Sequence, residues 1–239
     1  MTQTITAEQV ATAGSEVVAQ ARAAGATREE LSRVALRWAS EQFGSSLAML
    51  SSMGDEVLVH LASDELPGLD VVFIDTGYHF AETTGTRDAY AATRPITLIN
   101  ITPIQTIPEQ AAAHGEDLYA RDPNLCCALR KVEPLNRSLE GYHGWISGMR
   151  REDAPTRTDI NLIEYDAKRD KVKLNPLAEW TAADVDAYAA EHGVLLNPLR
   201  DAGYASIGCE PCTRPVAEGE DPRAGRWAGS NKTECGLHT

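Results

Sequence analysis

The chain has 239 residues, of which 43% are hydrophobic and 24% charged, a composition typical of a folded globular protein. Its formal net charge of −13 excludes a general nucleic-acid role, because neutralising phosphates requires a basic face. No apolar run reaches the roughly 18 residues of a membrane span, and the N-terminus lacks the pattern of a secretory signal. We therefore expect a cytoplasmic protein without a nucleic-acid or membrane partner.

The first 101 residues alternate between helical and strand patterns. Two helices come first, and Thr27 with Glu30 fits a capping box at the start of the second. Short apolar runs then alternate with helices, which indicates βαβ units in a parallel sheet. The expected helices are 6–24, 27–43, 56–61 and 80–92, and the expected strands are 45–50, 70–75 and 96–101.

The second part of the chain is less regular. We expect an irregular region with a short helix, then a helix that carries two cysteines and is interrupted by Pro134. Thr181 is expected to cap a later helix that ends near Gly193. The predicted fold class is α/β, a parallel twisted sheet with flanking helices and a loop-rich C-terminal tail. The expected segments are the irregular region 102–124, the cysteine helix from 125, strands 144–149, 161–165 and 171–174, and two domains, 1–198 and 199–239.

The five cysteines fall into two close pairs and one single residue. Cys126 and Cys127 are adjacent, Cys209 and Cys212 are separated by two residues, and Cys235 stands alone near the C-terminus. A chain of this length can build a core without disulfides, and in a reducing compartment cysteine clusters usually serve metal binding or catalysis. We interpret the two pairs as a set of four metal ligands and Cys235 as a free nucleophile.

The adjacent pair favours an iron–sulfur cluster over a structural zinc ion. Neighbouring side chains on a helix point about 100° apart, so two such thiolates converge poorly on one Zn²⁺ at ~2.3 Å. A [4Fe–4S] cluster offers four separate iron corners, and divergent sulfurs can each bind one. Two other interpretations stay open: a thioredoxin-like dithiol at Cys209 and Cys212, or inert buried thiols at Cys126 and Cys127.

Three predicted loops follow the carboxyl ends of strands, where open parallel sheets bind ligands. The loop 51–54 offers hydroxyls and backbone N–H groups to an anion, although it lacks the Gly-Lys-Ser/Thr of a Walker A motif. The other two loops are 75–77 and 147–150. Each loop alone is also explained as an ordinary strand-to-helix turn, and only the combination with the cysteine set indicates an anion site.

Basic residues concentrate in the half of the chain that contains every cysteine. Residues 1–120 carry a net charge of −10 and residues 121–239 a net charge of −3, so a small anion can be received in the second half. Lys232 and His238 are close to Cys235 in sequence, and exposed thiols near cationic groups ionise more easily. We therefore take Cys235 and His238 as catalytic candidates, with an incidental terminal cysteine as the alternative.

Together these motifs resemble those of the assimilatory adenylylsulfate (APS) reductases, in the family that also contains the 3′-phosphoadenylylsulfate (PAPS) reductases. The segments 75–79 (DTGYH) and 148–151 (GMRR) fit this family too, and the resemblance covers roughly residues 40–239. The cysteine motifs that carry it are Cys126-Cys-Ala-Leu-Arg-Lys131, Ser206-Ile-Gly-Cys-Glu-Pro-Cys-Thr-Arg-Pro215 and Glu234-Cys-Gly-Leu-His238.

The resemblance implies an adenine-nucleotide α-hydrolase-like fold and one [4Fe–4S] cluster per chain. It also implies the reduction of adenylylsulfate to sulfite and AMP, in which Cys235 attacks the activated sulfur. Thioredoxin then releases sulfite from the S-sulfocysteine and ends as its own disulfide. Because thiols provide both electrons, we expect a structural and electrostatic role for the cluster. The implied cluster ligands are Cys126, Cys127, Cys209 and Cys212.

The resemblance further assigns residues to the substrate. Lys131 follows Cys127 by four residues, about one helical turn, and can reach both the cluster and a bound sulfate. Arg223 and Arg226 match family arginines that hold the phosphosulfate, whereas Asp75 is equally explained as a charge at a helix N-terminus. The other expected substrate contacts are Ser51, Ser52, Ile74, Thr76, Gly77, Gly148, Arg150 and Arg157.

Alternatives to this assignment remain. The segment 51–55 departs from the Ser-Gly-Gly-x-x-Ser loop of related ATP pyrophosphatases, which argues against ATP cleavage. A PAPS reductase is the nearest alternative, although members specific for that substrate usually lack the double cysteine. An ATP-dependent tRNA-thiolation protein and a metal-bound redox sensor are alternatives from other classes, and the sequence leaves homo-oligomer formation open.

Overall fold

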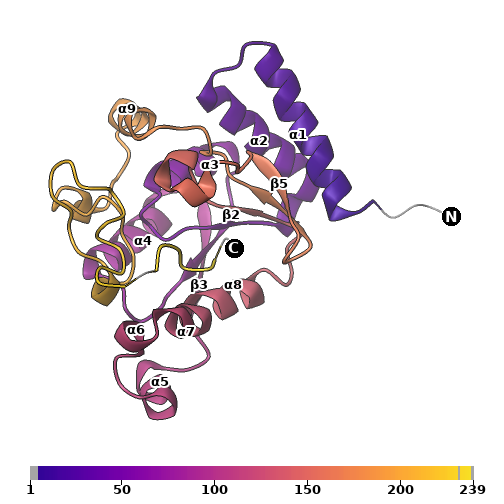
Figure 1. Ribbon diagram of the computed structural model, residues 1–239. Helices are drawn as coiled ribbons and strands as arrows, with labels where there is room; N and C mark the ends of the chain where they lie inside the picture. The colour runs from indigo at the N-terminus through magenta and orange to yellow at the C-terminus, as the bar shows by residue number, and fades with distance from the viewer. Residues whose placement is uncertain (1–4, 231, 238–239) are drawn as a thin grey trace.

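The computed structural model of the protein describes residues 5–230 and 232–237. A six-stranded sheet runs through these residues, with helices on both of its faces (Figure 1). The strands are β1 (Leu47–Leu50), β2 (Leu69–Ile74), β3 (Ile96–Ile101), β4 (Gly144–Ile146), β5 (Ile163–Asp166) and β6 (Lys171–Leu174). They are ordered β3-β2-β1-β4-β6-β5 across the sheet.

The predicted parallel sheet is confirmed for every strand except β5. The pairs β1–β2, β1–β4, β2–β3 and β4–β6 are all parallel, whereas β5 and β6 pair in the antiparallel sense. Only residues 167–170 join β5 to β6, and a connection this short can link antiparallel neighbours but not parallel ones. The result is a parallel α/β sheet with one antiparallel strand at its edge.

Local capping sets where several helices begin. The hydroxyl of Thr27 accepts from the backbone N–H of Glu30, whose side chain accepts from the backbone of Thr27, as the sequence predicts. Thr181 forms the same arrangement with Asp184, and that helix ends at Gly193 with φ of 60°. The helices are α1 (Ala7–Ala23), α2 (Arg28–Phe43), α3 (Glu56–Glu65), α4 (Ala81–Thr93), α5 (Ile107–His114), α6 (Leu118–Arg121), α7 (Pro123–Cys127), α8 (Glu133–Ser138) and α9 (Ala182–His192).

The central strand β1 is buried on both faces, and its alternate residues serve two separate cores. Leu47 and Met49 belong to the larger core, which also includes residues of α1, α2, α3 and α9. Ala48 and Leu50 belong to a smaller core on the other face, where they join Leu135 of α8. The smaller core therefore supports the helical segment that carries the cysteine pair.

The expectation that Pro134 interrupts the cysteine helix is wrong, because Pro134 lies within α8, which continues that helix. The helix of α7 continues through a π-helical segment, η2 (Ala128–Val132), directly into α8. In this segment the N–H of Glu133 bonds to the carbonyl of Ala128, five residues earlier. Proline has no backbone N–H, and inside a regular α-helix this would disrupt the hydrogen bonding. The wider π-helical turn just before Pro134 allows the helix to continue past it. The preceding region also contains two short helices, α5 and α6, where one was expected.

The described part of the C-terminal segment is loop-built, as expected. It contains the short 3₁₀ segments η5 (Pro198–Arg200) and η6 (Glu210–Cys212) and an isolated β-bridge between Thr213 and Arg226. In Figure 1 this orange-to-yellow segment lies beside the sheet and then turns back towards the centre of the molecule. The division into domains at residue 198 stays a prediction. None of the described helices has the length and apolar character to cross a membrane.

Leu135→Ala tests whether the smaller core supports the cysteine helix. Leu135 is fully buried, so removing its side chain leaves a cavity and should lower the free energy of unfolding by about 2–5 kcal/mol. Urea unfolding of the purified protein measures this change. Leu195→Ala is the matched control, since Leu195 is 49% exposed and its loss should cost less than about 0.5 kcal/mol. Equal destabilisation by both variants would contradict the role of this core.

Candidate active site

The loops after β1, β2 and β4 open onto one cavity of about 1080 Å³. The chain passes from β1 to β2 and β3 on one side, and later to β4 on the other side. The cavity thus lies at the carboxyl ends of the strands where the strand order reverses, the usual ligand position in open α/β sheets. Two of the three loops predicted from sequence, 51–54 and 147–150, line it almost throughout.

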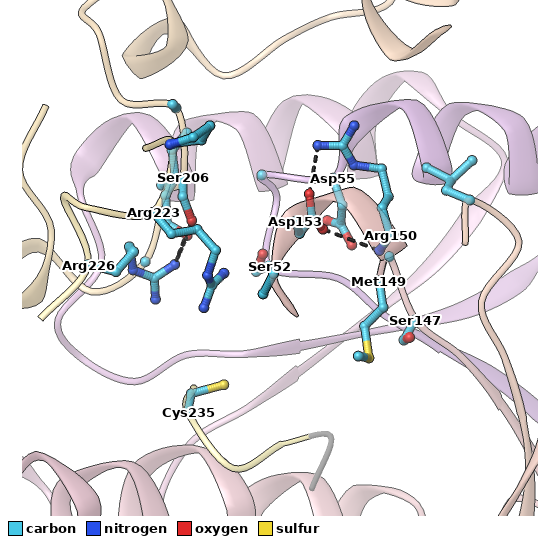
Figure 2. A pocket seen from close by; sticks show the side chains of 18 of the residues that line it. Ser52, Asp55, Ser147, Met149, Arg150, Asp153, Ser206, Arg223, Arg226 and Cys235 are labelled. Carbon is cyan, nitrogen blue, oxygen red and sulfur yellow. Dashed lines mark hydrogen bonds and ion pairs between the residues drawn. The ribbon is translucent and has the colours of Figure 1, made fainter. Parts of the chain in front are cut away.

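The two serines after β1 have different surroundings. The Ser51 hydroxyl is buried, donates to Asp55 Oδ1 at 2.6 Å and accepts from the N–H of Met53 at 3.1 Å. Ser52 is exposed and lines the cavity (Figure 2). Burial raises the pKa of the Asp55 carboxyl above its ordinary value. Ser51 therefore fixes the shape of the loop, and the hydroxyl of Ser52 is the one that can meet a ligand.

Gly148 is required where the loops after β1 and β4 approach each other. A Cβ added at this position would lie 2.6 Å from Asp55 Oδ2, well inside van der Waals contact. The preceding residue, Ser147, is buried and donates to Asn175 Oδ1 at 2.6 Å. The backbone of Gly148 is thus held against the loop 51–55 and exposed to the cavity.

Three of the four predicted arginines in the cavity wall pair with carboxylates. Arg150 pairs with Asp153 at 2.7 Å, and Figure 2 shows the pair on the side of the cavity away from Arg223 and Arg226. Arg157 donates through Nε and Nη2 to the two carboxylate oxygens of Glu234, at 2.9 and 2.8 Å. Arg223 approaches Glu234 Oε2 at 3.3 Å. The charges of these arginines are thereby largely compensated within the protein.

Two other cations of the cavity, Lys131 and Arg226, have no carboxylate partner among the described residues. Arg226 donates to the Ser206 hydroxyl at 3.1 Å, and burial together with the nearby charge of Arg223 lowers its pKa. Burial lowers the pKa of Lys131, but the nearby sulfurs of Cys209, Cys235 and Cys127 outweigh this effect, so the pKa is raised. Two uncompensated cations in one cavity attract an anionic group.

Cys235 lines the same cavity and is partly exposed. Figure 2 shows it on the side of Arg223 and Arg226, with its sulfur within the cavity. Lys131 and Arg226 line the same cavity as Cys235. The structure therefore brings the predicted nucleophile to the anion site. The other predicted catalytic candidate near it, His238, lies outside the described residues.

The four predicted ligand cysteines come together on the other side of Lys131. Together with Tyr78, Tyr119 and Pro123 they line one small void, and all four are free thiols. Burial and then the neighbouring sulfurs raise the pKa of Cys126 to about 12 and that of Cys212 to about 11. The lining cysteines are Cys126, Cys127, Cys209 and Cys212.

The four cysteines are near one another but do not form a metal site among the described residues. Among residues 5–230 and 232–237, no three His, Cys, Asp or Glu side chains converge as one ion requires. The four thiols instead share one small void, close to the loop after β2. The Thr76 hydroxyl is 3.3 Å from Cys209 Sγ, and the buried Arg130 donates to the Thr76 carbonyl at 2.5 Å.

Arg130 and His79 are site residues that sequence reasoning missed. Arg130 joins the cysteine helix to the loop after β2 and lies 5.3 Å over the ring of Tyr78. Its position four residues after Cys126, on the cysteine face of a helix, was the signal that could have identified it. His79 lines the cavity and bonds the Ile74 carbonyl at 2.9 Å, and its place at the end of the family segment 75–79 was the signal that could have identified it.

The loop after β2 is only partly at the cavity. Ile74 and Thr76 line it, but Asp75 and Gly77 are not among the residues that do. The Asp75 carboxylate accepts from the N–H of Gly77 at 3.0 Å and faces Arg87 at 3.6 Å. Asp75 therefore closes its own turn. The predicted residues that do line the cavity are Ser51, Ser52, Ile74, Thr76, Lys131, Gly148, Arg150, Arg157, Arg223, Arg226 and Cys235.

Fold and site thus define an open α/β protein with a thiol in the same cavity as two cations that no carboxylate compensates among the described residues. Residues 46–215 match the phosphoadenosine phosphosulfate reductase domain, which is more than half of the chain. The chain belongs to the phosphoadenosine phosphosulfate reductase family. This agrees with the resemblance found in the cysteine motifs.

Relatives named adenosine 5′-phosphosulfate reductase match almost the whole chain. The protein from Streptomyces coelicolor is 54% identical over 98% of this chain and 100% of its own length. Those from Rhodococcus opacus and Mycolicibacterium smegmatis are each 51% identical over 91% of this chain, covering 92% and 91% of their own lengths. Because the match to the Streptomyces protein covers 98% of this chain, it includes most of the C-terminal segment 199–239.

Solved structures support the fold. The phosphoadenylyl-sulfate reductase of Candida auris, in a phosphate complex, is 28% identical with a TM-score of 0.66, covering 84% of this chain and 97% of its own. The FMN adenylyltransferase of Candida glabrata with FMN and an ATP analogue gives a TM-score of 0.59 at 14% identity, covering 91% and 76%. The second likeness concerns the fold alone, and it confirms the predicted adenine-nucleotide α-hydrolase-like class.

Gly148→Ala tests the contact between the loops after β1 and β4. The added methyl group would collide with Asp55 and displace the loop 51–55, so AMP binding measured by calorimetry should weaken at least tenfold, about 1.4 kcal/mol. Gly141→Ala is the control, because a Cβ there meets nothing within 4 Å. Unchanged AMP affinity in Gly148→Ala would show that the contact between these loops does not contribute to nucleotide binding.

Proposed function

We propose that this protein reduces adenylylsulfate to sulfite and AMP in assimilatory sulfate reduction, with Cys235 as the nucleophile and thioredoxin as the reductant. The observation that carries the proposal is the position of Cys235 in the cavity that also contains the uncompensated Lys131 and Arg226. The relatives named adenosine 5′-phosphosulfate reductase support the substrate. The chain is accordingly a sulfur-group oxidoreductase of its family.

The nucleotide would lie along the loops that follow the strands. Ser52 and the backbone of Gly148 offer hydrogen-bond donors in the lining of the cavity. The backbone of Ile74 and Thr76 would meet the adenine or ribose. The phosphosulfate would then extend towards Lys131 and Arg226, whose positive charges are not used by protein carboxylates among the described residues. This placement puts the sulfo group next to Cys235.

In the first step the thiolate of Cys235 attacks the sulfur of the sulfo group. A sulfur–sulfur bond forms, the bond from that sulfur to the phosphate oxygen breaks, and AMP leaves with the electron pair. Lys131 and Arg226 stabilise the negative charge that grows on the phosphate, so the charge of the leaving group is met by fixed cations. Binding in one cavity supplies the orientation. The product is an S-sulfocysteine at position 235.

In the second step a thiolate of thioredoxin attacks Sγ of Cys235 and sulfite leaves. The second thiol of thioredoxin resolves the mixed disulfide by thiol–disulfide exchange, and Cys235 is regenerated. Two electrons pass from the dithiol to the sulfur, so the reaction balances without another reductant. Cys235 must be reachable from outside for this step, and its partial exposure on a C-terminal segment supports that requirement.

We infer that Cys126, Cys127, Cys209 and Cys212, which line one small void, would together hold one [4Fe–4S] cluster per chain. Such a cluster would supply a fixed local charge and hold the loops of the site together. The residues of this chain that face it have defined tasks: Thr76 and Arg130 join the β2 loop to the cysteine helix, and Lys131 extends from that helix into the cavity. Free thiols in this number suit the reducing cytoplasm.

PAPS is the alternative substrate, because the family and the Candida auris structure carry that name. The double cysteine and the relatives at about half identity favour adenylylsulfate. Turnover with both nucleotides at equal concentration separates the two. Faster sulfite release from PAPS would overturn the substrate assignment but would leave the chemistry at Cys235 intact.

Mixing the protein with adenylylsulfate in the absence of thioredoxin tests the proposed reaction. One SO₃ group should be added to the tail peptide that contains Cys235, and AMP should appear in equal amount. Mass spectrometry of the digested protein measures the adduct, and Cys235→Ser should abolish both products. AMP release by Cys235→Ser at the wild-type rate would disprove the role of this thiol.

Metal analysis tests the four-cysteine site. The protein purified without oxygen should be brown and contain about four iron atoms and four acid-labile sulfides per chain, as a [4Fe–4S] cluster requires. Cys209→Ser should lose most of this iron, whereas Cys235→Ser should retain it. Stoichiometric zinc without iron would contradict the cluster.

A further inference from the structure

Glu234, the residue before Cys235, is the point at which the tail contacts the cavity wall most extensively. Its Oε1 accepts from Arg157 Nε at 2.9 Å, and its Oε2 accepts from Arg157 Nη2 at 2.8 Å, which makes a bidentate ion pair. Thr156 donates to Oε1 at 3.2 Å and Arg223 to Oε2 at 3.3 Å. Four donors therefore converge on one carboxylate that is adjacent to the nucleophile.

This contact is well shielded from solvent. The side chain of Arg157 is 10% exposed and that of Glu234 is 15% exposed. Burial alone would raise the pKa of Glu234, but the hydrogen bonds and charge of Arg157 outweigh it and hold that pKa below its ordinary value. A bidentate, shielded guanidinium–carboxylate pair fixes geometry more strongly than an exposed ion pair does.

The partners of Glu234 belong to two different parts of the chain. Arg157 lies in η4 (Pro155–Arg157), after β4, and also faces Asp153 at 3.3 Å. Arg223 lies in the loop-built segment and donates to the Thr233 carbonyl at 2.8 Å as well. Glu234 therefore ties the tail both to the wall of the α/β domain and to the segment from which the tail emerges.

The pairing changes the expected role of two arginines. Arg157 and Arg223 were assigned to the substrate from the sequence, but both already bind the carboxylate of Glu234. Lys131 and Arg226 retain their charge for an incoming anion. Of these four cations, Arg157 and Arg223 contact the tail, whereas Lys131 and Arg226 have no carboxylate partner among the described residues.

We propose that Glu234 is a positioning residue whose bidentate contact with Arg157, supported by Arg223, sets where Cys235 stands relative to the anion site. This inference rests on the proposed function, since it assigns Cys235 the role of nucleophile. In it Arg157 and Arg223 hold the tail through the carboxylate of Glu234. The competing role for the same carboxylate is to occupy the place of a substrate anion, and the two roles predict opposite effects on nucleotide binding.

Hydrogen–deuterium exchange of the full-length protein, without substrate, tests the contact itself. Glu234→Gln keeps the size of the side chain and removes its charge, so the peptide that contains the tail should exchange about tenfold faster, equivalent to ~1.4 kcal/mol. Glu220→Gln is the matched control, because Glu220 pairs with Arg214 in the same segment but does not line the cavity. Unchanged exchange of the tail in Glu234→Gln would overturn the proposal.

A double-mutant cycle identifies Arg157 as the partner. Arg157→Gln and Glu234→Gln should each accelerate exchange of the tail, and the double variant should exchange no faster than the single variants, because both remove one contact. Additive effects would show that the two residues act separately and would contradict the proposed pair.

Kinetic and binding measurements distinguish positioning from competition with the substrate. In Glu234→Gln the single-turnover rate of Cys235 sulfonation at saturating adenylylsulfate should fall about tenfold, while the Kd of AMP stays within about twofold of wild type. Glu234→Asp keeps the charge and should recover part of the rate. Markedly tighter AMP binding by Glu234→Gln, with an unchanged rate, would show that the carboxylate occupies the anion site and would overturn the proposal.

Failure of the proposed function remains distinguishable from failure of this inference. If the wild-type protein forms no sulfonate at Cys235, the reaction is wrong. The exchange experiment and the AMP affinities still decide whether Glu234 fixes the tail, because neither depends on turnover.

Discussion

Uncompensated positive charge inside one cavity is the constraint on which the rest of this structure depends. The chain carries a net charge of −13, and most cations of the cavity are paired with its own carboxylates. Lys131 and Arg226 are the exceptions among the described residues. Fixed cations that face a developing negative charge, in a site partly closed to water, are an effective source of transition-state stabilisation. Because neither side chain pairs with a carboxylate among the described residues, both charges would be available to an anion in an otherwise acidic protein.

The helix from α7 to α8 connects this charge to the thiol site. Two adjacent residues of its π-helical segment have different roles. Arg130 binds the loop after β2, and Lys131 lines the cavity. Cys126 and Cys127 from the same helix line the small void. One continuous helical segment therefore carries two of the four thiols, Cys126 and Cys127, and also Lys131, which lines the cavity.

The sequence predicts the parts of this arrangement that depend on local pattern. Strand periodicity and caps such as Thr27 and Thr181 follow from residues near one another, and cysteine spacing indicates a ligand set. The antiparallel edge strand β5 and the π-turn before Pro134 were not predicted, because both depend on how distant packing accommodates a local irregularity. The pairing of Arg157 with Glu234 joins residues 77 positions apart, and no spacing rule encodes which arginine meets which carboxylate.

The rate of Cys235 sulfonation in Lys131→Met, measured in a single turnover with iron content determined in the same sample, tests the central claim most directly. The account predicts a fall of about 100-fold at unchanged iron content, since one preorganised charge at the leaving group is lost. Lys131→Arg, which keeps the charge, should recover part of this loss. A wild-type rate in Lys131→Met with a full complement of iron would contradict the account.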